Sequence, residues 1–441
     1  MSFLNKFIND IKLFNYLNKY LSSTIVIAVS GGPDSMTLLD LSRKWAINNQ
    51  IKIIAITINH NLRKESYLES KLVKEYADKY GIEFHELKWV HGKISGNILA
   101  KARNARYKLL TKFSHDRDIL NIFTAHQKND YIENFFIRVL HGSGILGLTN
   151  QYINFYNNVR ILRPLYNFSK QDCIKYVRTE KIDFCEDRSN NDMKYLRVRT
   201  RKYLSSIENL ERITNTQTHI GNISSMVKDG LIKLIASSTH ISPTGYAIIK
   251  KNILLSSNIE LQTLLISHLL SVIGDQEKNF PRLNIVKNIL NRYGRYTAYG
   301  CIIYHNDNEI ILYREFGKKY PNDVLVRNNN IWDNRFKCFF KGTIEDVITK
   351  LKIQLNELVI TYLTHTDYKN IKKFLKLDKL YKNANTEYIK ILFTLPVIKY
   401  SKKLVAIPSV RYYINKKVKR LFKNHINLIF YPQIISRLVH L

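Results

Sequence analysis

Short apolar runs alternate with longer segments of helical spacing along the first part of the chain. Four runs predict β-strands, at residues 24–30, 51–59, 83–90 and 119–125. The first, second and fourth runs are apolar almost throughout, which is typical of strands covered on both faces. Three segments between them carry apolar side chains three and four positions apart and predict helices, at residues 36–47, 65–80 and 97–113.

This alternation predicts an α/β fold built on a doubly wound parallel sheet. Ligands of such sheets bind beyond the carboxyl ends of the strands. Ser30, Asn59 and Ala125 lie at or directly after the ends of three predicted strands. We therefore expect the functional site in the loops at these three positions.

Later parts of the chain have a different pattern, and 441 residues are too many for one ordinary domain. After about residue 215 helices predominate with occasional short strands, and from residue 335 onward the chain is strongly basic. We expect an ATP-binding catalytic domain at residues 1–215, a mostly helical middle region at residues 216–334, and a small basic α+β domain at residues 335–441.

The charge balance indicates a polyanionic partner. The chain has 69 Lys and Arg against 36 Asp and Glu, a net charge of +33. A field of that sign attracts nucleic acid, because each neutralised phosphate releases counterions. A lysine-rich surface that reflects a biased genome is the alternative interpretation of the same composition.

Cysteine usage and hydropathy point to the cytoplasm. The four cysteines, Cys173, Cys185, Cys301 and Cys338, contain no CxxC pair, which argues against a zinc ribbon or a clustered iron–sulfur ligand set. The N-terminal residues do not resemble a signal peptide, and no run is long and apolar enough to span a membrane. We expect a cytoplasmic protein with no membrane partner.

A glycine-rich segment joins the first predicted strand to the first predicted helix, with the sequence Ser30-Gly31-Gly32-Pro33-Asp34-Ser35. The glycines let backbone amides approach an anion, and the N-terminus of the following helix favours negative charge. Ser30 and Ser35 add hydroxyl donors. Asp34 would repel a phosphate unless a cation lies between them, which suggests Mg²⁺ at Asp34. A plain turn with serine caps is the alternative.

The segment lacks the lysine of the GxxxxGK(S/T) phosphate-binding loop. It resembles instead the SGGxDS loop of the PP-loop ATP pyrophosphatases, which cleave ATP between its α- and β-phosphates and pass AMP to an acceptor. The resemblance implies that residues 30–35 bind ATP. Acceptors in that superfamily range from small metabolites to tRNA bases, so the loop alone leaves the acceptor open.

Further motifs occur in the order and spacing seen in tRNA(Ile)-lysidine synthetases. They are His60-Asn61-Leu62-Arg63, Gly96-Asn97, Ala102-Arg103, Arg106-Tyr107, Thr124-Ala125-His126, Asp130, Glu133, His141-Gly142-Ser143-Gly144, Arg163-Pro164-Leu165, Glu186-Asp187 and Ser189-Asn190. The chain is similar to that family over about residues 24–204. Weaker similarity continues in Gly300-Cys301, Arg314-Glu315 and residues 395–410, where the family contacts tRNA.

Several positions depart from the family pattern. The chain has His126-Gln127 where the family has a doubled His, and Asn129-Asp130 where it has a doubled Asp. It has Asp187-Arg188-Ser189-Asn190 in place of DPSN, and Val198 in place of an Asn between two arginines. Roles are therefore carried only onto His126 and Asp130 of the two pairs, and Gln127 and Asn129 receive none.

The resemblance implies a ligase that forms a C–N bond in two steps. The C2 carbonyl oxygen of the wobble cytidine in a CAU anticodon attacks the α-phosphate of ATP and expels pyrophosphate. The ε-amine of free L-lysine then attacks C2, AMP departs, and lysidine changes the codon read from AUG to AUA. The implied cofactors are ATP and Mg²⁺, and the implied partners are L-lysine and tRNA(Ile), with a homodimer left open.

Two groups of side chains are candidates for this chemistry. Arg103 and Arg106 lie three apart on one predicted helix, so both can hold phosphates from one face. Asp130 and Glu133 share a helical face beyond the fourth strand, with His126 at its tip. The two carboxylates could bind Mg²⁺, hold the lysine substrate or accept its proton, and the sequence does not apportion these roles. Solvated arginines and acidic groups that complement a helix dipole are the structural alternatives.

Two basic segments are candidates for RNA binding. Residues 194–202 hold five basic side chains and no acidic one, including Arg197, Arg199 and Arg201. Near the C-terminus, basic residues interleave with Tyr412, Tyr413 and Phe422, a mixture that suits an RNA backbone. The basic members of that second segment are Lys416, Lys417, Lys419, Arg420 and Lys423. Solvated charged faces are the alternative for both.

Three other functions remain open at this point. A tRNA thiolase would share the loop but generally needs paired cysteines, which this chain lacks. A non-catalytic basic RNA-binding protein would bind tRNA without releasing pyrophosphate. An amide-forming synthetase for a small metabolite would release pyrophosphate without tRNA.

Overall fold

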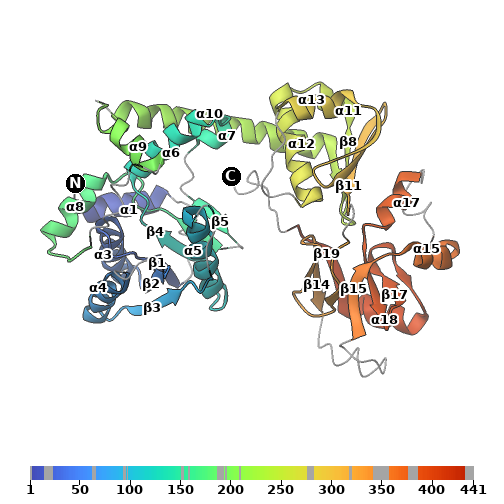
Figure 1. Ribbon diagram of the computed structural model, residues 1–441, viewed down its shortest axis with the longest axis horizontal. Coiled ribbons are helices and arrows are strands. Elements are labelled where there is room, and N and C mark those ends of the chain that lie inside the picture. The colour runs from blue at the N-terminus through green and yellow to red at the C-terminus, as the bar shows by residue number, and fades with distance from the viewer. Residues whose placement is uncertain are drawn as a thin grey trace. The chain divides into compact units, whose positions relative to one another are not determined.

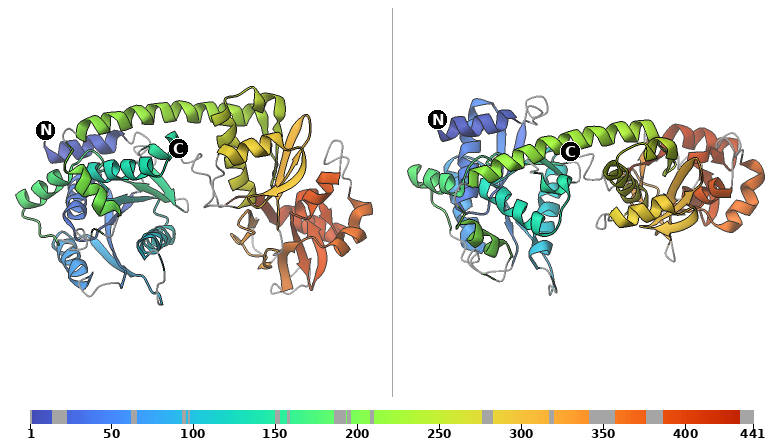
Figure 2. Two further views of the ribbon diagram at one scale, coloured as in Figure 1. Left: turned by 45° about the horizontal axis from the view of Figure 1, so that its top comes forward. Right: turned by 90° about the horizontal axis from the view of Figure 1, so that it is seen from above.

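The computed structural model describes residues 2–13, 23–61, 66–92, 96, 98–149, 153–156, 159–185, 193, 196–207, 210–275, 283–316, 320–340, 357–375 and 386–432. The chain forms two compact units, Met1–Ser224 and Ser225–Leu441 (Figure 1). The boundary between them falls within helix α10 (Leu210–Ser238), which Figure 2 shows as one continuous helix.

The first unit contains a six-stranded sheet with the strand order β3-β2-β1-β4-β6-β5. The strands are β1 (Thr24–Ala28), β2 (Lys52–Asn59), β3 (Glu83–Lys88), β4 (Asn121–Thr124), β5 (Ile153–Tyr156) and β6 (Val159–Leu162). Neighbouring strands pair in parallel, except that β5 is antiparallel to β6 at the edge. The carboxyl ends of β1, β2 and β4 therefore lie at the same edge of the sheet.

Both faces of this sheet are covered by helices. Ile25 and Ile27 of β1 pack in a core with side chains of α3 (Pro33–Asn48), α4 (Ser66–Lys79) and α8 (Lys170–Thr179). Between them, Val26 points to the opposite core, which contains Leu110 of α5 (Ile98–His115). Burial on both faces explains why the strands are apolar throughout. The predicted doubly wound sheet is confirmed.

Other helices complete the first unit: α1 (Phe3–Leu13), α6 (Lys128–Leu140), α7 (Ile145–Leu148) and α9 (Leu196–Leu204). Helix α1 buries Phe7 and Ile11 in the core that contains α3. Helix α6 begins directly beyond β4, and α9 packs against it. Helix α6 carries Asp130 and Glu133, and α9 carries Arg197, Arg199 and Arg201.

The second unit begins with a five-stranded antiparallel sheet of order β7-β8-β11-β10-β9. Its strands are β7 (Thr239–Ile241), β8 (Tyr246–Lys250), β9 (Gly294–Ala298), β10 (Cys301–His305) and β11 (Glu309–Arg314). One face packs against α12 (Ile259–Gly274) and α13 (Leu283–Asn291), and the short α11 (Lys251–Leu255) follows β8. The middle of the chain thus combines the predicted helices with a sheet more extensive than the sequence suggested.

Two smaller sheets form the C-terminal part of this unit. One comprises β12 (Val324–Leu325), β15 (Leu358–Tyr362), β16 (Pro396–Tyr400), β17 (Lys403–Ile407) and β18 (Tyr412–Tyr413). The other comprises β13 (Ile331–Trp332), β14 (Phe336–Phe340) and β19 (Ile426–Phe430). The helical elements are α15 (His365–Ile371), α17 (Thr386–Leu392), α18 (Lys416–His425) and the 3-10 turns Lys372–Phe374 and Pro408–Val410. Antiparallel strands with helices confirm the predicted α+β character.

Candidate active site

The glycine-rich segment forms a tight turn between β1 and α3. Ser35 Oγ accepts from the backbone N–H of Ser30 at 3.1 Å and donates to the carbonyl oxygen of Gly32 at 2.9 Å. The hydroxyl of Ser30 donates to Oγ of Ser35 at 3.3 Å. The two serines thus fix the turn from both ends.

Of the two glycines of the turn, only Gly31 is required by its backbone conformation and by the space around it. Gly31 has φ +80, and a Cβ at this position would lie 3.3 Å from the carbonyl oxygen of Glu69. Gly32 caps α3 without any side-chain hydrogen bond, and Pro33 is the first helical residue. Proline there removes no hydrogen bond, because the first amides of a helix have no partner within it.

The absence of a side-chain cap distinguishes α3 from two neighbouring helices. Helix α6 has a capping box between Gln127 and Asp130, and α8 has one between Ser169 and Asp172. These caps satisfy the first amides of α6 and α8. At α3 the first-turn amides and the positive end of the helix dipole stay available to an anion.

Asp34, in the first turn of α3, is a carboxylate with an unsatisfied oxygen. Its Oδ1 is buried and has no hydrogen-bond partner among the described residues, and the side chain of Cys173 lies beside the carboxylate. Burial, together with the charge of Asp130, raises the pKa of Asp34 to about 6, against the opposing charges of Lys170 and Arg201. A cation such as Mg²⁺ bound beside Asp34 would satisfy Oδ1.

Asp130 and Glu133 of α6 are held by two arginines of α9. Arg197 donates from Nη2 to Oδ1 of Asp130 at 2.7 Å and from Nε to Oε2 of Glu133 at 2.7 Å. Arg201, one turn later, donates from Nε to Oε1 of Glu133 at 2.7 Å. Both oxygens of Glu133 are therefore occupied, and this side chain is only 1% exposed.

This pairing bears on the prediction that Arg197, Arg199 and Arg201 bind RNA. Arg197 and Arg201 face inward to the two carboxylates, because residues four apart lie on the same side of a helix. Arg199 lies on the exposed side of α9. The structure thus divides the three arginines between two environments, and an RNA contact by any of them stays a prediction.

His126 lies among the arginines of the site. Burial lowers its pKa well below the ordinary value, and the charges of Arg163, Arg103, Arg197 and Arg106 lower it further. The imidazole is therefore neutral at pH 7. Its Nδ1 lies 3.1 Å from Oγ1 of Thr124, at the carboxyl end of β4.

Arg103 and Arg106 lie on α5, as predicted, but in different surroundings. Arg103 is exposed, with its guanidinium 5.1 Å from the ring centroid of Tyr107. Arg106 is half-buried, with Nη2 3.5 Å from Nε2 of His60. Burial lowers the pKa of Arg106, and the nearby charge of Arg103 acts in the same direction. Two cations three positions apart on one helix favour an anionic ligand between them.

Two departures from the family pattern have structural roles. The side chain of Gln127 caps α6 by accepting from the backbone N–H of Asn129 at 2.6 Å. Asn129 Oδ1 accepts from the backbone N–H of Lys170 at 3.1 Å and so joins the first turns of α6 and α8. Lys170 belongs to none of the motifs identified in the sequence. The N-terminus of its helix, α8, does have a sequence signal, because Ser169 is followed three positions later by Asp172.

Several residues named from the sequence lie outside the described part of the chain. These are Leu62, Arg63, Asn97, Glu186, Asp187, Arg188, Ser189, Asn190 and Lys194. Within the described residues, no group of three or more His, Cys, Asp and Glu side chains is placed to hold a metal. A cation at Asp34 would be completed by ligands other than these described side chains, such as phosphate oxygens.

All four cysteines are free thiols, and Cys173, Cys301 and Cys338 are buried. In the part of the chain that the structure describes, no helix is both long and apolar enough to cross a bilayer.

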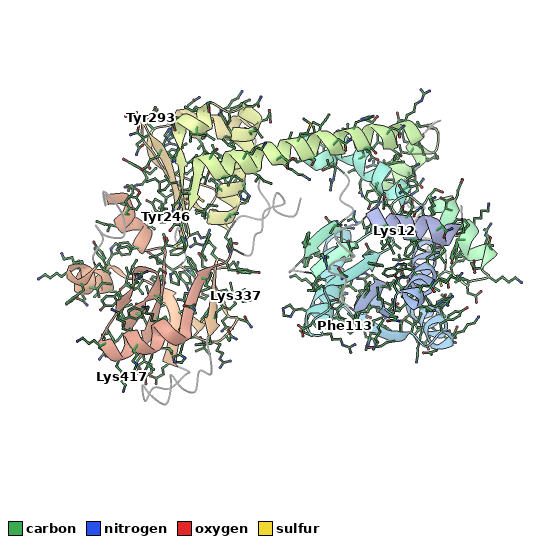
Figure 3. All side chains as sticks on the ribbon, turned by 180° about the vertical axis from the view of Figure 1, so that it is seen from behind. Lys12, Phe113, Tyr246, Tyr293, Lys337 and Lys417 are labelled. Atoms are coloured by element: carbon green, nitrogen blue, oxygen red, sulfur yellow. The ribbon has the colours of Figure 1, made fainter. Side chains whose placement is uncertain are left out.

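The C-terminal basic segment forms α18, which is amphipathic. Its lysines and arginine are exposed, and Figure 3 labels Lys417 on this helix. Val418, Leu421 and Phe422 face the core. The expectation that Phe422 joins an RNA-binding surface is wrong, because this ring is fully buried. The helical period places it on the side opposite to the lysines.

A glycine turn followed by an uncapped helix at the carboxyl edge of a parallel sheet is a geometry that binds phosphate groups. In agreement, residues 5–207 match the family model described as a PP-loop domain. The fold and the site thus define the class: a PP-loop protein that uses ATP.

Curated relatives narrow this class. The chain is 37% identical to the tRNA(Ile)-lysidine synthase of Orientia tsutsugamushi, over 94% of this chain and 95% of the relative. It is 35% identical to that of Rickettsia bellii, over 97% of each. Among solved structures, the U34-tRNA thiolase NcsA from Methanococcus maripaludis has a TM-score of 0.42 and 15% identity over 50% of this chain and 80% of that chain. The chain belongs to the tRNA(Ile)-lysidine synthase family.

Proposed function

We propose that this protein ligates L-lysine to C2 of the wobble cytidine in the CAU anticodon of tRNA(Ile), with ATP converted to AMP and pyrophosphate. The observation that carries the proposal is the uncapped N-terminus of α3 behind Gly31 and Gly32, next to the unsatisfied Oδ1 of Asp34. The choice of tRNA(Ile) as the acceptor is supported by membership of the tRNA(Ile)-lysidine synthase family.

The first step places ATP in the turn at residues 30–35. The amides of the first turn of α3 face its phosphates, and Ser30 and Ser35 hold the turn in shape. The cytidine oxygen then attacks the α-phosphorus, and the electron pair of the broken bond leaves with pyrophosphate. Arg103 and Arg106 of α5 are candidates to offset the charge that builds on the phosphates.

The structure favours a division of roles among the three carboxylates. Asp34 is the candidate Mg²⁺ ligand, because its buried Oδ1 lacks a partner among the described residues. Mg²⁺ bound there would offset phosphate charge. Asp130 is a second carboxylate close to Asp34. One of its oxygens caps α6, and the other accepts from Arg197. Glu133 is only 1% exposed, against 17% for Asp130, and serves to hold Arg197 and Arg201.

The second step requires a deprotonated lysine amine. His126, neutral and in contact with Thr124, can accept or donate a hydrogen bond at the edge of the sheet. Its lowered pKa makes it a weak base, so its role in the proposal is to orient the amine or the cytidine. Asp130, a carboxylate that is partly exposed, is the candidate proton acceptor.

The second unit and the exposed side of α9 are proposed to bind the tRNA. Five exposed basic side chains lie on α18, namely Lys416, Lys417, Lys419, Arg420 and Lys423. Cations on an exposed helix bind phosphates without reading sequence. The proposed substrates, tRNA and ATP, support a cytoplasmic location. The homodimer stays a prediction, which light scattering of the purified protein would test.

The test is incorporation of labelled lysine. The protein is incubated with ATP, Mg²⁺, radiolabelled L-lysine and a tRNA transcript with a CAU anticodon, and label is followed in the RNA. We expect one AMP and one pyrophosphate for each lysine incorporated, and no label in a matched transcript with a UAU anticodon. If no label enters the CAU transcript although the protein binds ATP, the proposed function is wrong.

The Asp34→Ala variant separates catalysis from RNA binding. It is expected to bind the transcript like the wild type but to incorporate no lysine. Unchanged incorporation would contradict the role of Asp34. Pyrophosphate release that does not depend on tRNA would instead indicate a small-molecule synthetase. The names of the relatives favour lysine over sulfur as the group transferred, so the thiolase alternative is not favoured.

A further inference from the structure

Helix α8 brings to the site a lysine that belongs to no sequence motif. Lys170 is the first residue of α8 and follows its N-cap, Ser169. The backbone N–H of Lys170 donates to Oδ1 of Asn129 at 3.1 Å. The backbone N–H of Lys128 donates to the carbonyl oxygen of Phe168 at 2.8 Å. These two hydrogen bonds hold the start of α8 against the start of α6, next to Asp130.

One turn later, α8 is fixed to the helix that carries Asp34. Thr37 Oγ1 of α3 donates to the carbonyl oxygen of Cys173 at 3.1 Å, and the side chain of Cys173 lies beside the carboxylate of Asp34. Residues three apart lie on the same helical face, so Lys170 and Cys173 share the face directed at Asp34. In agreement, Lys170 is the strongest of the charges that oppose the upward shift of the pKa of Asp34 by burial and by Asp130.

The ammonium of Lys170 is not committed to a close ion pair in the described part of the chain. The nearest acidic residue on its own helix, Asp172, accepts from the backbone of Ser169 and pairs with Lys6 at 2.9 Å. Lys170 is half-buried. A lysine held this way beside an anion site is a cation available to a ligand.

We propose that Lys170 binds the β- and γ-phosphates of ATP and stabilises the departing pyrophosphate. The turn at residues 30–35 lacks the lysine that other phosphate-binding loops carry at their helix start. Helix α8, more than a hundred positions later in the sequence, supplies that charge in space. The inference rests on the proposed use of ATP and adds a residue to it.

The chemical step defines what Lys170 does. A bond forms between the cytidine oxygen and the α-phosphorus, and the bond from the α-phosphorus to the oxygen that bridges to the β-phosphorus breaks. The electron pair stays on that oxygen and leaves with pyrophosphate. An ammonium next to the β-phosphate stabilises this charge and is not itself altered. AMP retains the α-phosphate and has no contact with Lys170.

The test compares the affinities of pyrophosphate and AMP in the Lys170→Gln variant by calorimetry in the presence of Mg²⁺. The expected loss of pyrophosphate affinity is roughly 10- to 100-fold, the value of one hydrogen bond between charged groups. AMP affinity should stay at the wild-type value. The matched control is Lys175→Gln, an exposed lysine on the same helix, which should bind both ligands like the wild type. In turnover, the variant should lose kcat for pyrophosphate release and keep its KM for lysine.

A measurement on the wild-type protein covers the case in which the variant does not fold. Pyrophosphate should protect Lys170 from reductive methylation, whereas AMP should not, and Lys175 should react equally in both. Pyrophosphate and AMP affinities that fall together, or an unchanged pyrophosphate affinity, would overturn the proposal and leave Lys170 as a counter-ion of Asp34. The calorimetric titrations and the methylation use neither RNA nor lysine, so failure of lysidine formation in the wild type is a separate result.

Discussion

Arg197 donates from Nε to Oε2 of Glu133 at 2.7 Å, although the two residues are 64 positions apart in the sequence. The carboxylate of Glu133 is 1% exposed, whereas the guanidinium side chain of Arg197 is 37% exposed. The buried partner therefore depends on the arginine for its compensating charge. Helix α9 is held to α6 by this ion pair and by those of Arg201 with Glu133 and of Arg197 with Asp130.

Replacement of Glu133 should destabilise the first unit. Glu133→Gln removes the negative charge that Arg197 and Arg201 share, and breaking a buried ion pair costs about 3 kcal/mol of unfolding free energy. Urea denaturation of the full chain measures this loss. Glu75→Gln is the matched control, because Glu75 is 67% exposed and its pair with Lys71 is long, at 3.8 Å. Equal stability of the two variants would show that the pairs to Glu133 contribute little.

Gly31→Ala should lower the affinity for ATP. The left-handed backbone costs about 1 to 2 kcal/mol for a residue with a Cβ, and the added carbon would press on the carbonyl oxygen of Glu69 at 3.3 Å. Gly81→Ala is the control, since Gly81 has a similar φ of +65 and open space around it. Calorimetric titration with ATP should show weaker binding for Gly31→Ala alone. Wild-type affinity in both would mean that the turn does not hold the nucleotide.

Activity and stability should respond to pH in opposite directions through Asp34. Its folded pKa of about 6 lies above the ordinary value of 3.8. The protonated form is therefore favoured in the folded state, so this group stabilises the fold below pH 3.8, and that contribution is lost as the pH rises through 6. Lysidine formation needs the ionised form and should rise with an inflection at or below pH 6, because bound Mg²⁺ favours the carboxylate.

The Asp34→Asn variant checks this assignment. Its unfolding free energy should lose the part of the pH dependence that lies between about pH 4 and pH 6 in the wild type. Asp10 is a buried carboxyl of α1 whose pKa burial also raises to about 6, so part of the slope should remain. A slope that is identical in wild type and variant would assign the titration to other groups.

Neutralising the exposed face of α18 should weaken RNA binding with a reduced dependence on salt. Lys417→Gln, Lys419→Gln and Arg420→Gln are combined, and each lost phosphate contact lowers the slope of log K against log salt by about 1. The control replaces three exposed lysines of α4, namely Lys71, Lys74 and Lys79, with the same loss of charge. Filter binding of the tRNA at several salt concentrations provides the slopes. Equal slopes for the two triple variants would exclude local contacts by α18.

The sequence by itself determined the parallel sheet and the phosphate turn. Strands buried on both faces must be apolar throughout, so β1, β2 and β4 could be predicted from the local pattern of apolar residues. The turn at residues 30–35 is also local, because its glycines, serines and helix start are consecutive. The strands β8 to β11 were underestimated, since the neighbouring apolar helix α12 gave the stronger pattern.

Only the tertiary structure decided which charges meet. Arg197 reaches Asp130 and Glu133 from 67 and 64 positions away, and Lys170 reaches the site through Asn129 of another helix. Electrostatic partners are chosen by distance in space, and no spacing along a chain encodes that distance. For the same reason Phe422 could be read as part of a basic surface until the packing of α18 showed its ring in the core.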